Sequence, residues 1–159
     1  MKALLVAAML AALSLAAVPA GRAQAPPPSA QQTAAARGGA AAAAQCQSMA
    51  WSMEDYSGCI DGAVAHAMDN DRASPSFQLG VYCSAFYALA QAYDAKMWKQ
   101  SVVDRNEIEV TTVDQFGSCL YAARSIRLAP SQICTAVGAD CATFNPLIER
   151  WKKISNKDM

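Results

Sequence analysis

The chain lacks most of the side chains and motifs on which enzyme active sites depend. It has one histidine, His66, and contains neither a G-x-S-x-G nucleophile elbow nor a C-x-x-C-H haem attachment motif. Any Ser–His–acid triad would have to use His66. Glu54 and Asp61 share a predicted helix face, but two carboxylates in that position are more often a solvated surface than a catalytic pair. We therefore expect no enzymatic activity and no cofactor.

An excess of basic charge is also missing, because 13 lysines and arginines are balanced by 13 aspartates and glutamates. One basic cluster stands near the end of the chain: Arg150, Lys152, Lys153 and Lys157. Cations at the C-terminal end of a helix interact favourably with its dipole, which favours a solvated helix end over a phosphate or lipid site. Because nucleic-acid-binding domains concentrate basic charge on one face, we expect no nucleic-acid partner.

Charge is absent from an apolar run that extends from Ala3 to Val18 after the basic residue Lys2. A retained membrane anchor needs about 20 apolar residues, and this run is shorter and is followed by proline and small residues. The pattern is typical of a secretory signal peptide. We expect residues 1–23 to be this signal peptide, with cleavage after Ala23 or, alternatively, after Ala20. The mature protein is then periplasmic or secreted, with no membrane span.

Large apolar side chains are missing from residues 24–44, which consist mostly of alanine, proline, glycine and glutamine. Such a segment cannot bury enough apolar surface to offset the entropy lost on ordering. We expect it to be a disordered tether. The remainder, residues 45–159, is long enough for one helical domain with its own core.

This domain does contain cysteine. Its six cysteines all lie beyond the tether: Cys46, Cys59, Cys83, Cys119, Cys134 and Cys141. Zinc sites use close pairs of the C-x₂-C type, and this chain has none. An even number of cysteines in an exported domain indicates disulfide bonds. We expect three.

The spacing of the apolar residues predicts an all-α fold, a small disulfide-stapled bundle of four to five helices. Steps of three and four predict a first helix over residues 45–70. Ser74 as N-cap and Pro75 at the first helical position begin a second helix, over residues 75–100, which has two apolar sides and is expected to be the most buried. These two helices form an antiparallel hairpin. Further helices are expected to open at a capping box at Thr112, to span residues 131–137, and to begin at Asn145.

The disulfide pairing follows from the register of this hairpin. A turn near residues 71–73 places Cys59 opposite Cys83 and Gly62 opposite Gly80. Glycines next to the bridge would let the two backbones approach to the distance that a disulfide requires. The same rule applied to the next connection, together with a short local loop, gives the other two bridges. The predicted pairs are Cys46–Cys119, Cys59–Cys83 and Cys134–Cys141.

For the residues around His66, the alternative to ordinary packing in the helix core is a site for a soft metal ion. It would combine His66 with residues nearby in the sequence: Met49, Met53, Met68 and Asp69. Thioether and imidazole groups suit Cu(I). Met49 and Met53, however, follow the spacing of a helix core, and Met68 points about 200° away from His66 around the helix axis. We therefore expect no bound metal.

Tryptophan supplies the candidate partner surface. Trp98 and Trp151 stand near predicted helix ends beside lysines, where full burial is difficult. Exposed tryptophan is enriched at protein interfaces, so we take these two residues as a candidate surface for a partner. The alternative is that both residues close the ends of the core.

Together these features indicate an exported, non-catalytic helical protein that acts by binding a protein partner in the periplasm. It would be an accessory subunit, an inhibitor or an immunity-type factor in the cell envelope. In plan the chain resembles small helical periplasmic immunity proteins, which combine a signal peptide, helices and disulfides. It has no motif specific to that group, and no site residue is transferred. The alternative function is a periplasmic small-ligand or metal carrier that uses the region of His66.

Overall fold

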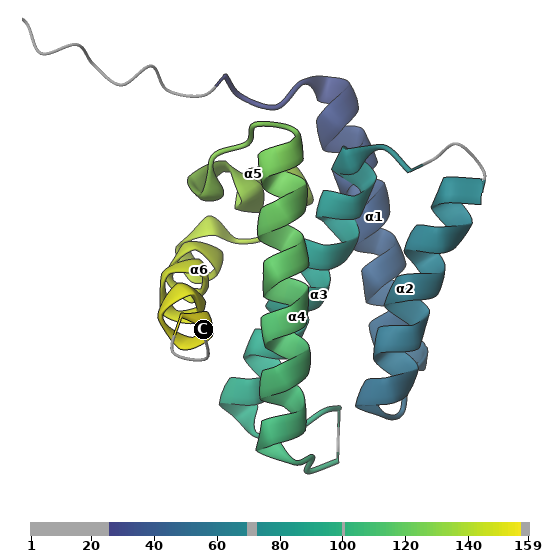
Figure 1. Ribbon diagram of the computed structural model, residues 1–159, viewed down its shortest axis with the longest axis vertical. Helices are drawn as coiled ribbons and strands as arrows, with labels where there is room; N and C mark the ends of the chain where they lie inside the picture. The colour runs from purple at the N-terminus through teal and green to yellow at the C-terminus, as the bar shows by residue number, and fades with distance from the viewer. Residues whose placement is uncertain (1–25, 70–72, 100, 157–159) are drawn as a thin grey trace, which may run out of the picture.

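The computed structural model describes residues 26–69, 73–99 and 101–156, and within these ranges it is helical with short connections (Figure 1). Six α-helices and one 3₁₀ turn follow in order: α1 Ala30–Met49, α2 Met53–Asp69, α3 Pro75–Ala95, α4 Arg105–Ser125, η1 Pro130–Gln132, α5 Ile133–Val137 and α6 Cys141–Ser155. The prediction of an all-α, disulfide-stapled bundle is confirmed, with six α-helices in the described residues instead of four to five. The expected signal peptide, residues 1–23, lies outside the described residues.

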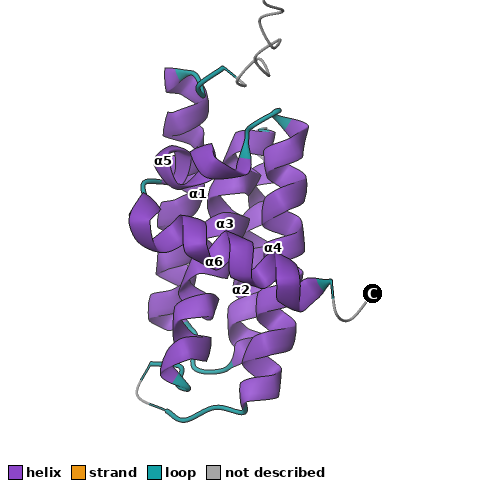
Figure 2. Cartoon of the chain, turned by 90° about the vertical axis from the view of Figure 1, so that its left-hand side faces the viewer, coloured by secondary structure: helices purple, strands orange, loops and turns teal. Residues whose placement is uncertain are grey.

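The four long helices α1 to α4 run alternately up and down, so that α1 and α3 share one direction and α2 and α4 the other (Figure 1). The short α5 and the helix α6 lie on one side of this group, and α6 runs across the long helices (Figure 2). None of the helices in the part of the chain that the structure describes combines the length and apolar character that crossing a membrane requires.

The segment 24–44 is not a disordered tether as expected, because α1 occupies most of it. A capping box begins the helix: the Ser29 hydroxyl oxygen accepts a hydrogen bond from the Gln32 backbone N–H at 3.1 Å, and the Gln32 side-chain oxygen accepts one from the Ser29 N–H at 2.8 Å. Alanine, the best helix former, then fills the following turns. The helix persists because it packs closely along α3.

Two glycines allow this close packing of α1 against α3. A Cβ atom added at Gly39 would overlap the Phe77 carbonyl oxygen, and one added at Gly80 would overlap the Ala36 carbonyl group. Gly80 therefore does mark a close helix contact, but with α1 instead of α2. Gly62, its predicted partner, has no heavy atom within 4 Å of an added Cβ.

The helix expected over residues 45–70 is broken at Ala50, where the chain turns. The Ser52 hydroxyl accepts a hydrogen bond from the Asp55 N–H at 3.0 Å, and the Asp55 carboxylate accepts one from the Ser52 N–H at 3.3 Å. This reciprocal pair begins α2 as a new helix that runs back along α1. The predicted hairpin of 45–70 against 75–100 is therefore replaced by a hairpin of α1 and α2.

This turn also changes the disulfide pairing. The bridges are Cys46–Cys59, with Cα atoms 5.6 Å apart, Cys83–Cys119, at 4.6 Å, and Cys134–Cys141, at 5.1 Å. The local pair is as predicted, whereas the predicted bridges Cys46–Cys119 and Cys59–Cys83 are wrong. The reason is that the register argument treated residues 45–70 as one helix, and the turn at Ala50 brings the first two cysteines together instead.

The remaining helix boundaries agree in part with the prediction. Ser74 and Pro75 begin α3 as expected, with the Ser74 hydroxyl accepting from the Phe77 N–H at 3.2 Å. The helix α4 begins at Arg105, seven residues before the predicted start at Thr112, with Asp104 as its N-cap. The short α5 ends at a left-handed Gly138, as expected, and α6 begins before Asn145.

Both tryptophans of the candidate partner surface are buried, which corrects that assignment. Trp98 is 1% exposed, stacks on Tyr56 with ring centroids 4.7 Å apart, and donates a hydrogen bond to the Ala50 carbonyl oxygen at 3.5 Å. Trp151 is 0% exposed and meets Phe86 edge to face at 6.3 Å. They belong to two separate core clusters, one on each side of α3. Both residues therefore close the core, the alternative considered above.

The N-cap of α6 gives the fold an expected response to acid. The Asp140 carboxylate accepts hydrogen bonds from the Thr143 hydroxyl and from the backbone N–H groups of Ala142 and Thr143, and these bonds hold its pKa below the ordinary value of 3.8. A lowered pKa in the folded state stabilises the fold fully above that ordinary value, and the stabilisation is lost as the pH falls through the folded-state pKa. Urea unfolding measured across this acidic range should therefore show a steeper loss for the natural chain than for Asp140→Asn, which caps without titrating. Parallel curves for the two proteins would contradict this assignment.

Candidate functional site

The described surface has a groove between α1 and α2, with a volume of about 630 Å³. We call it the α1–α2 groove. One wall comes from α1 and consists of Gly38, Ala41, Ala42, Gln45, Cys46 and Met49. The other comes from α2 and consists of Cys59, Gly62, Ala63, His66 and Ala67. Phe77, from the first turn of α3, completes the lining.

Both walls follow directly from helical periodicity. On each helix the lining residues recur at steps of three and four, so each wall is one face of one helix. Nearly all of them are small, and small side chains leave the space between the helices unfilled. Figure 1 shows α1 and α2 joined at their lower ends and farther apart at their upper ends.

Two fixed features form the floor of the groove. The Cys46–Cys59 bridge joins its walls near the turn between the helices, with its Cα atoms 5.6 Å apart. The Phe77 ring lies toward the other end, where an added Cβ at Gly38 would be 3.9 Å from its edge. The floor is therefore apolar at both ends and is built from parts that cannot easily move aside.

The polar groups that line the groove are few. His66 and Gln45 lie on opposite walls, and both are exposed to solvent. Among the described lining residues, His66 is the one with an imidazole side chain. An apolar cleft with a small number of convergent polar groups is the usual form of a binding site.

Acidic residues flank the groove on the α2 side. The helix α2 carries Glu54, Asp55, Asp61 and Asp69, and α1 carries the single basic residue Arg37. Asp55 stands four residues before Cys59 and Asp69 three residues after His66, so both share the face of α2 that lines the groove. The Arg37 side chain points away from the groove, because it lies against Gly138 at the end of α5.

Asp61 is directed away from the groove. Burial raises the pKa of the Tyr82 phenol on α3, and the nearby Asp61 carboxylate raises it further. Asp61 therefore faces α3. This leaves Asp55 and Asp69 as the acids on the groove side of α2.

The metal-binding set weighed from the sequence is dispersed in the structure. The Cys46–Cys59 bridge sets the register of the two antiparallel helices, so His66 lies level with Gly39, whereas Met49 lies near the turn. The two side chains stand about 15 Å apart along the groove. Met53 is buried in the core, and Met68 is exposed outside the groove. No three histidine, cysteine, aspartate or glutamate residues gather in the described ranges at a distance suited to one metal ion.

The exposed tryptophan of the described residues is Trp51, in the turn between α1 and α2. Its side chain is 82% exposed, and the Lys99 ammonium lies 4.9 Å from the centre of its ring. Lys99 also donates a hydrogen bond to the Ser48 carbonyl oxygen at 2.9 Å, which fixes this turn against the connection between α3 and α4. Trp51 therefore lies against the connection between α3 and α4, where it lines a separate hollow with Trp98, Lys99 and Ser101.

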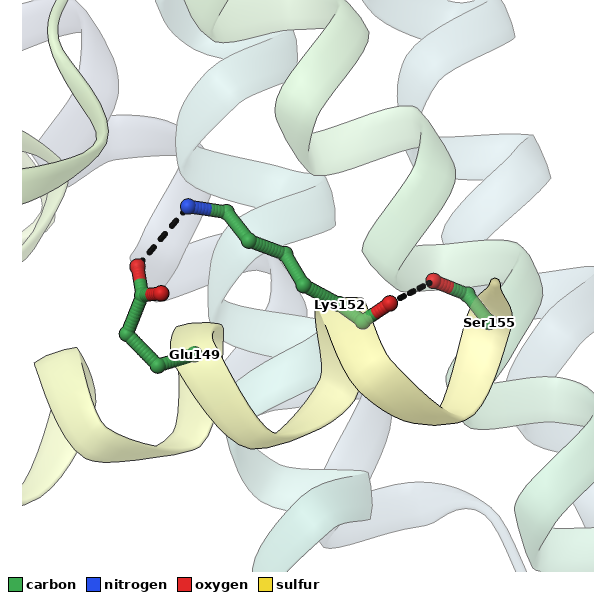
Figure 3. A network of polar contacts seen from close by, with 3 residues as sticks. All are labelled: Glu149, Lys152 and Ser155. Atoms are coloured by element: carbon green, nitrogen blue, oxygen red, sulfur yellow. Dashed lines mark hydrogen bonds and ion pairs between the residues drawn. The ribbon is translucent and has the colours of Figure 1, made fainter. Parts of the chain in front are cut away.

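Three residues of the basic cluster, Arg150, Lys152 and Lys153, lie on α6, where neighbouring acids partly neutralise them; Lys157 lies outside the described residues. Lys152 pairs with Glu149 at 2.8 Å, and the Lys152 carbonyl oxygen accepts a hydrogen bond from the Ser155 hydroxyl (Figure 3). Arg150 pairs with Asp94 of α3 at 2.9 Å. These contacts tie α6 to itself and to α3, so we do not take the cluster as the candidate site.

The structure brings together only part of the site that the sequence suggested. His66 lies in the groove, while Trp98 and Trp151 lie in the core. Part of the α1 wall was missed, because Gly38, Ala41 and Ala42 fell in the segment 24–44 that was expected to be disordered. The signal that could have found it is the capping pattern at Ser29 and Gln32, which opens a helix. Comparisons of the chain with protein-family models, with curated proteins and with solved structures gave no match.

Proposed function

We propose that this is an exported, non-catalytic protein that binds a protein partner through the α1–α2 groove. The observation that carries the proposal is the groove itself, an apolar hollow of about 630 Å³ left open along the outside of the bundle. A mostly apolar cleft with a few polar groups is the usual form of a binding site. The exposed Trp51, in the turn that joins the two groove helices, lies outside the groove lining but is of a residue type that often anchors protein interfaces.

Several features support the location and the absence of catalysis in this proposal. Three disulfides are compatible with an oxidising compartment outside the cytoplasm. The apolar run near the start of the sequence supports export to the periplasm. The groove lining offers one titratable side chain, His66, and acid–base or nucleophilic catalysis generally needs at least two cooperating groups. A role as accessory subunit, inhibitor or immunity-type factor fits these features.

Site-specific photo-cross-linking in the native cells tests the proposal. A photoreactive amino acid in place of Ala41, which lines the groove, should give a discrete adduct with another protein in the periplasmic fraction. The matched control is Ala44, which is exposed on the same helix outside the groove and should give no such adduct. Equal labelling from both positions, or no protein adduct from Ala41, would count against a partner in this groove.

A second candidate function, a carrier of a small apolar ligand, is favoured by the contact of the groove with His66. The groove volume falls within the range of small-molecule sites, about 300–1,000 Å³. In the same experiment, native mass spectrometry of the purified protein would then show a bound small molecule, and Ala41 would label no protein. That pair of results would replace the first proposal with the second.

A further inference from the structure

Gly62 is a residue of the groove that the fold does not explain. An added Cβ atom at this position would have no other heavy atom within 4 Å, so packing inside the chain does not require glycine. Glycine inside a helix destabilises it relative to alanine. Gly62 faces the groove from the middle of α2, where the missing side chain leaves the helix backbone accessible. A glycine in such a position suits an occupant whose own backbone comes close.

The walls of the groove determine the shape of a suitable occupant. Both walls are α-helices, whose backbone N–H and C=O groups are already bonded within each helix. An extended peptide would gain no backbone hydrogen bonds here and would leave its own polar groups unsatisfied. A helix satisfies its backbone internally and can present one apolar face to a groove. From Gly38 to Met49 the α1 wall is about 17 Å long, which matches about three turns of such a helix.

The charged residues beside the groove indicate which charge the flanks of the bound helix should carry. The groove side of α2 carries Asp55 and Asp69, both exposed, and α1 has no acid or base there, because Arg37 lies against Gly138. The two groove helices together hold four acids and one base, whereas the whole chain holds 13 of each. Complementary charge across an interface favours a partner with basic residues at this rim.

We propose that the α1–α2 groove binds an amphipathic helix of the partner protein, with an apolar face directed into the groove, its backbone closest at Gly62, and lysine or arginine residues along its flank. This inference rests on the proposed function and names the element of the partner that enters the site. It is distinct from a fatty-acid or other small-molecule site, because that ligand would need neither the glycine nor the acidic rim.

Two synthetic peptides of about 18 residues, long enough to cover the groove, provide the test. Both carry the same leucine and alanine face, and they differ only in flanks of lysine or of glutamate. Fluorescence anisotropy with the oxidised full-length protein should show that the lysine peptide binds about tenfold more tightly than the glutamate peptide. Added salt should weaken the binding of the lysine peptide, because screening acts on exposed charges.

Matched glycine variants separate binding from folding. Gly62→Ala should weaken the binding of the lysine peptide about tenfold, because the new methyl group keeps the peptide backbone away. Gly58→Ala is the control, because Gly58 is also without neighbours within 4 Å and lies on the same helix outside the groove. Its affinity should stay unchanged. Both variants should melt at a higher temperature than the natural chain, so lost binding cannot come from lost folding.

A double variant that combines Asp55→Asn and Asp69→Asn tests whether these two carboxylates attract the lysine flank. Asparagine keeps an oxygen that can accept the hydrogen bond from the Ser52 N–H, so the start of α2 is preserved. The preference for the lysine peptide should fall below about threefold.

Three outcomes would overturn the inference: equal binding of the two peptides, equal effects of the two glycine variants, or no peptide binding at all. If neither peptide binds while Ala41 still cross-links to a protein, the helical partner is excluded and the proposed function stands. If Ala41 labels no protein, the proposed function fails first.

Discussion

Replacing Gly80 by alanine is expected to destabilise the folded protein by about 3 kcal/mol, because the added methyl group has no space. A Cβ atom at this position would overlap the Ala36 carbonyl group and approach the Ala40 nitrogen, and both belong to the backbone of α1. A flexible side chain could turn away, but a helix backbone cannot. The two helices would have to separate along their whole contact, and the interior of the bundle would lose its packing.

Urea unfolding of the purified, oxidised variants measures this effect. Gly62→Ala is the matched control, because the same substitution on α2 meets no neighbouring atom. It should leave the free energy of unfolding unchanged or raise it by about 0.5–1 kcal/mol. Gly39→Ala should behave like Gly80→Ala, since its Cβ would overlap the Phe77 carbonyl oxygen. If Gly80→Ala proved as stable as the control, the close contact of α1 with α3 would be wrong.

Removing the bridge between α3 and α4, by replacing both Cys83 and Cys119 with alanine, is expected to cost about 4 kcal/mol. The two cysteines are 36 residues apart, the longest separation of the three bridges, and both side chains are fully buried. A longer loop restricts the unfolded chain more when it is closed, so its loss destabilises the fold more. Removing the bridge between Cys134 and Cys141, which are seven residues apart, should cost only about 2 kcal/mol.

The two double variants serve as controls for each other in denaturant titrations, because each removes one bridge and leaves two. A larger loss from the Cys134–Cys141 variant would contradict the argument from loop length. Peptide mapping under non-reducing conditions tests the pairing itself. It should join the peptide that contains Cys83 to the one that contains Cys119, and a link from Cys59 to Cys83 would restore the pairing first derived from the sequence.

The buried helix α3 could be predicted because its signals are local and agree with one another. Ser74 and Pro75 mark its start, and apolar residues cover two of its sides. In the structure one side packs into the cluster with Phe86 and the other into the cluster with Leu89. The start of α1 was missed because alanine and glycine bury little surface, and that segment lacks the large side chains by which a core helix is usually detected. Its stability comes from a close contact with α3, which only the folded structure shows.

The disulfides and the site depended on this missing helix. Without α1, the turn at Ala50 could not be seen, and Cys59 was paired across the wrong hairpin. For the same reason the part of the groove wall formed by Gly38, Ala41 and Ala42 was missed, although His66 on the other wall had been singled out. Trp98 and Trp151 stand near helix ends beside lysines, but a position along the sequence does not tell which way a side chain points. Trp98 turns inward to Tyr56, and the exposed residue is Trp51.

The central position of α3 has a consequence for how the protein unfolds. This helix contributes residues to both core clusters. Phe86 belongs to one cluster and Leu89, three positions further along the same helix, belongs to the other. Neither core cluster can unfold while the other stays folded, because the unfolding of one would disrupt α3, against which the other packs. We therefore expect the protein to unfold as a single cooperative unit, with the emission of Trp98 and that of Trp151 changing in the same transition.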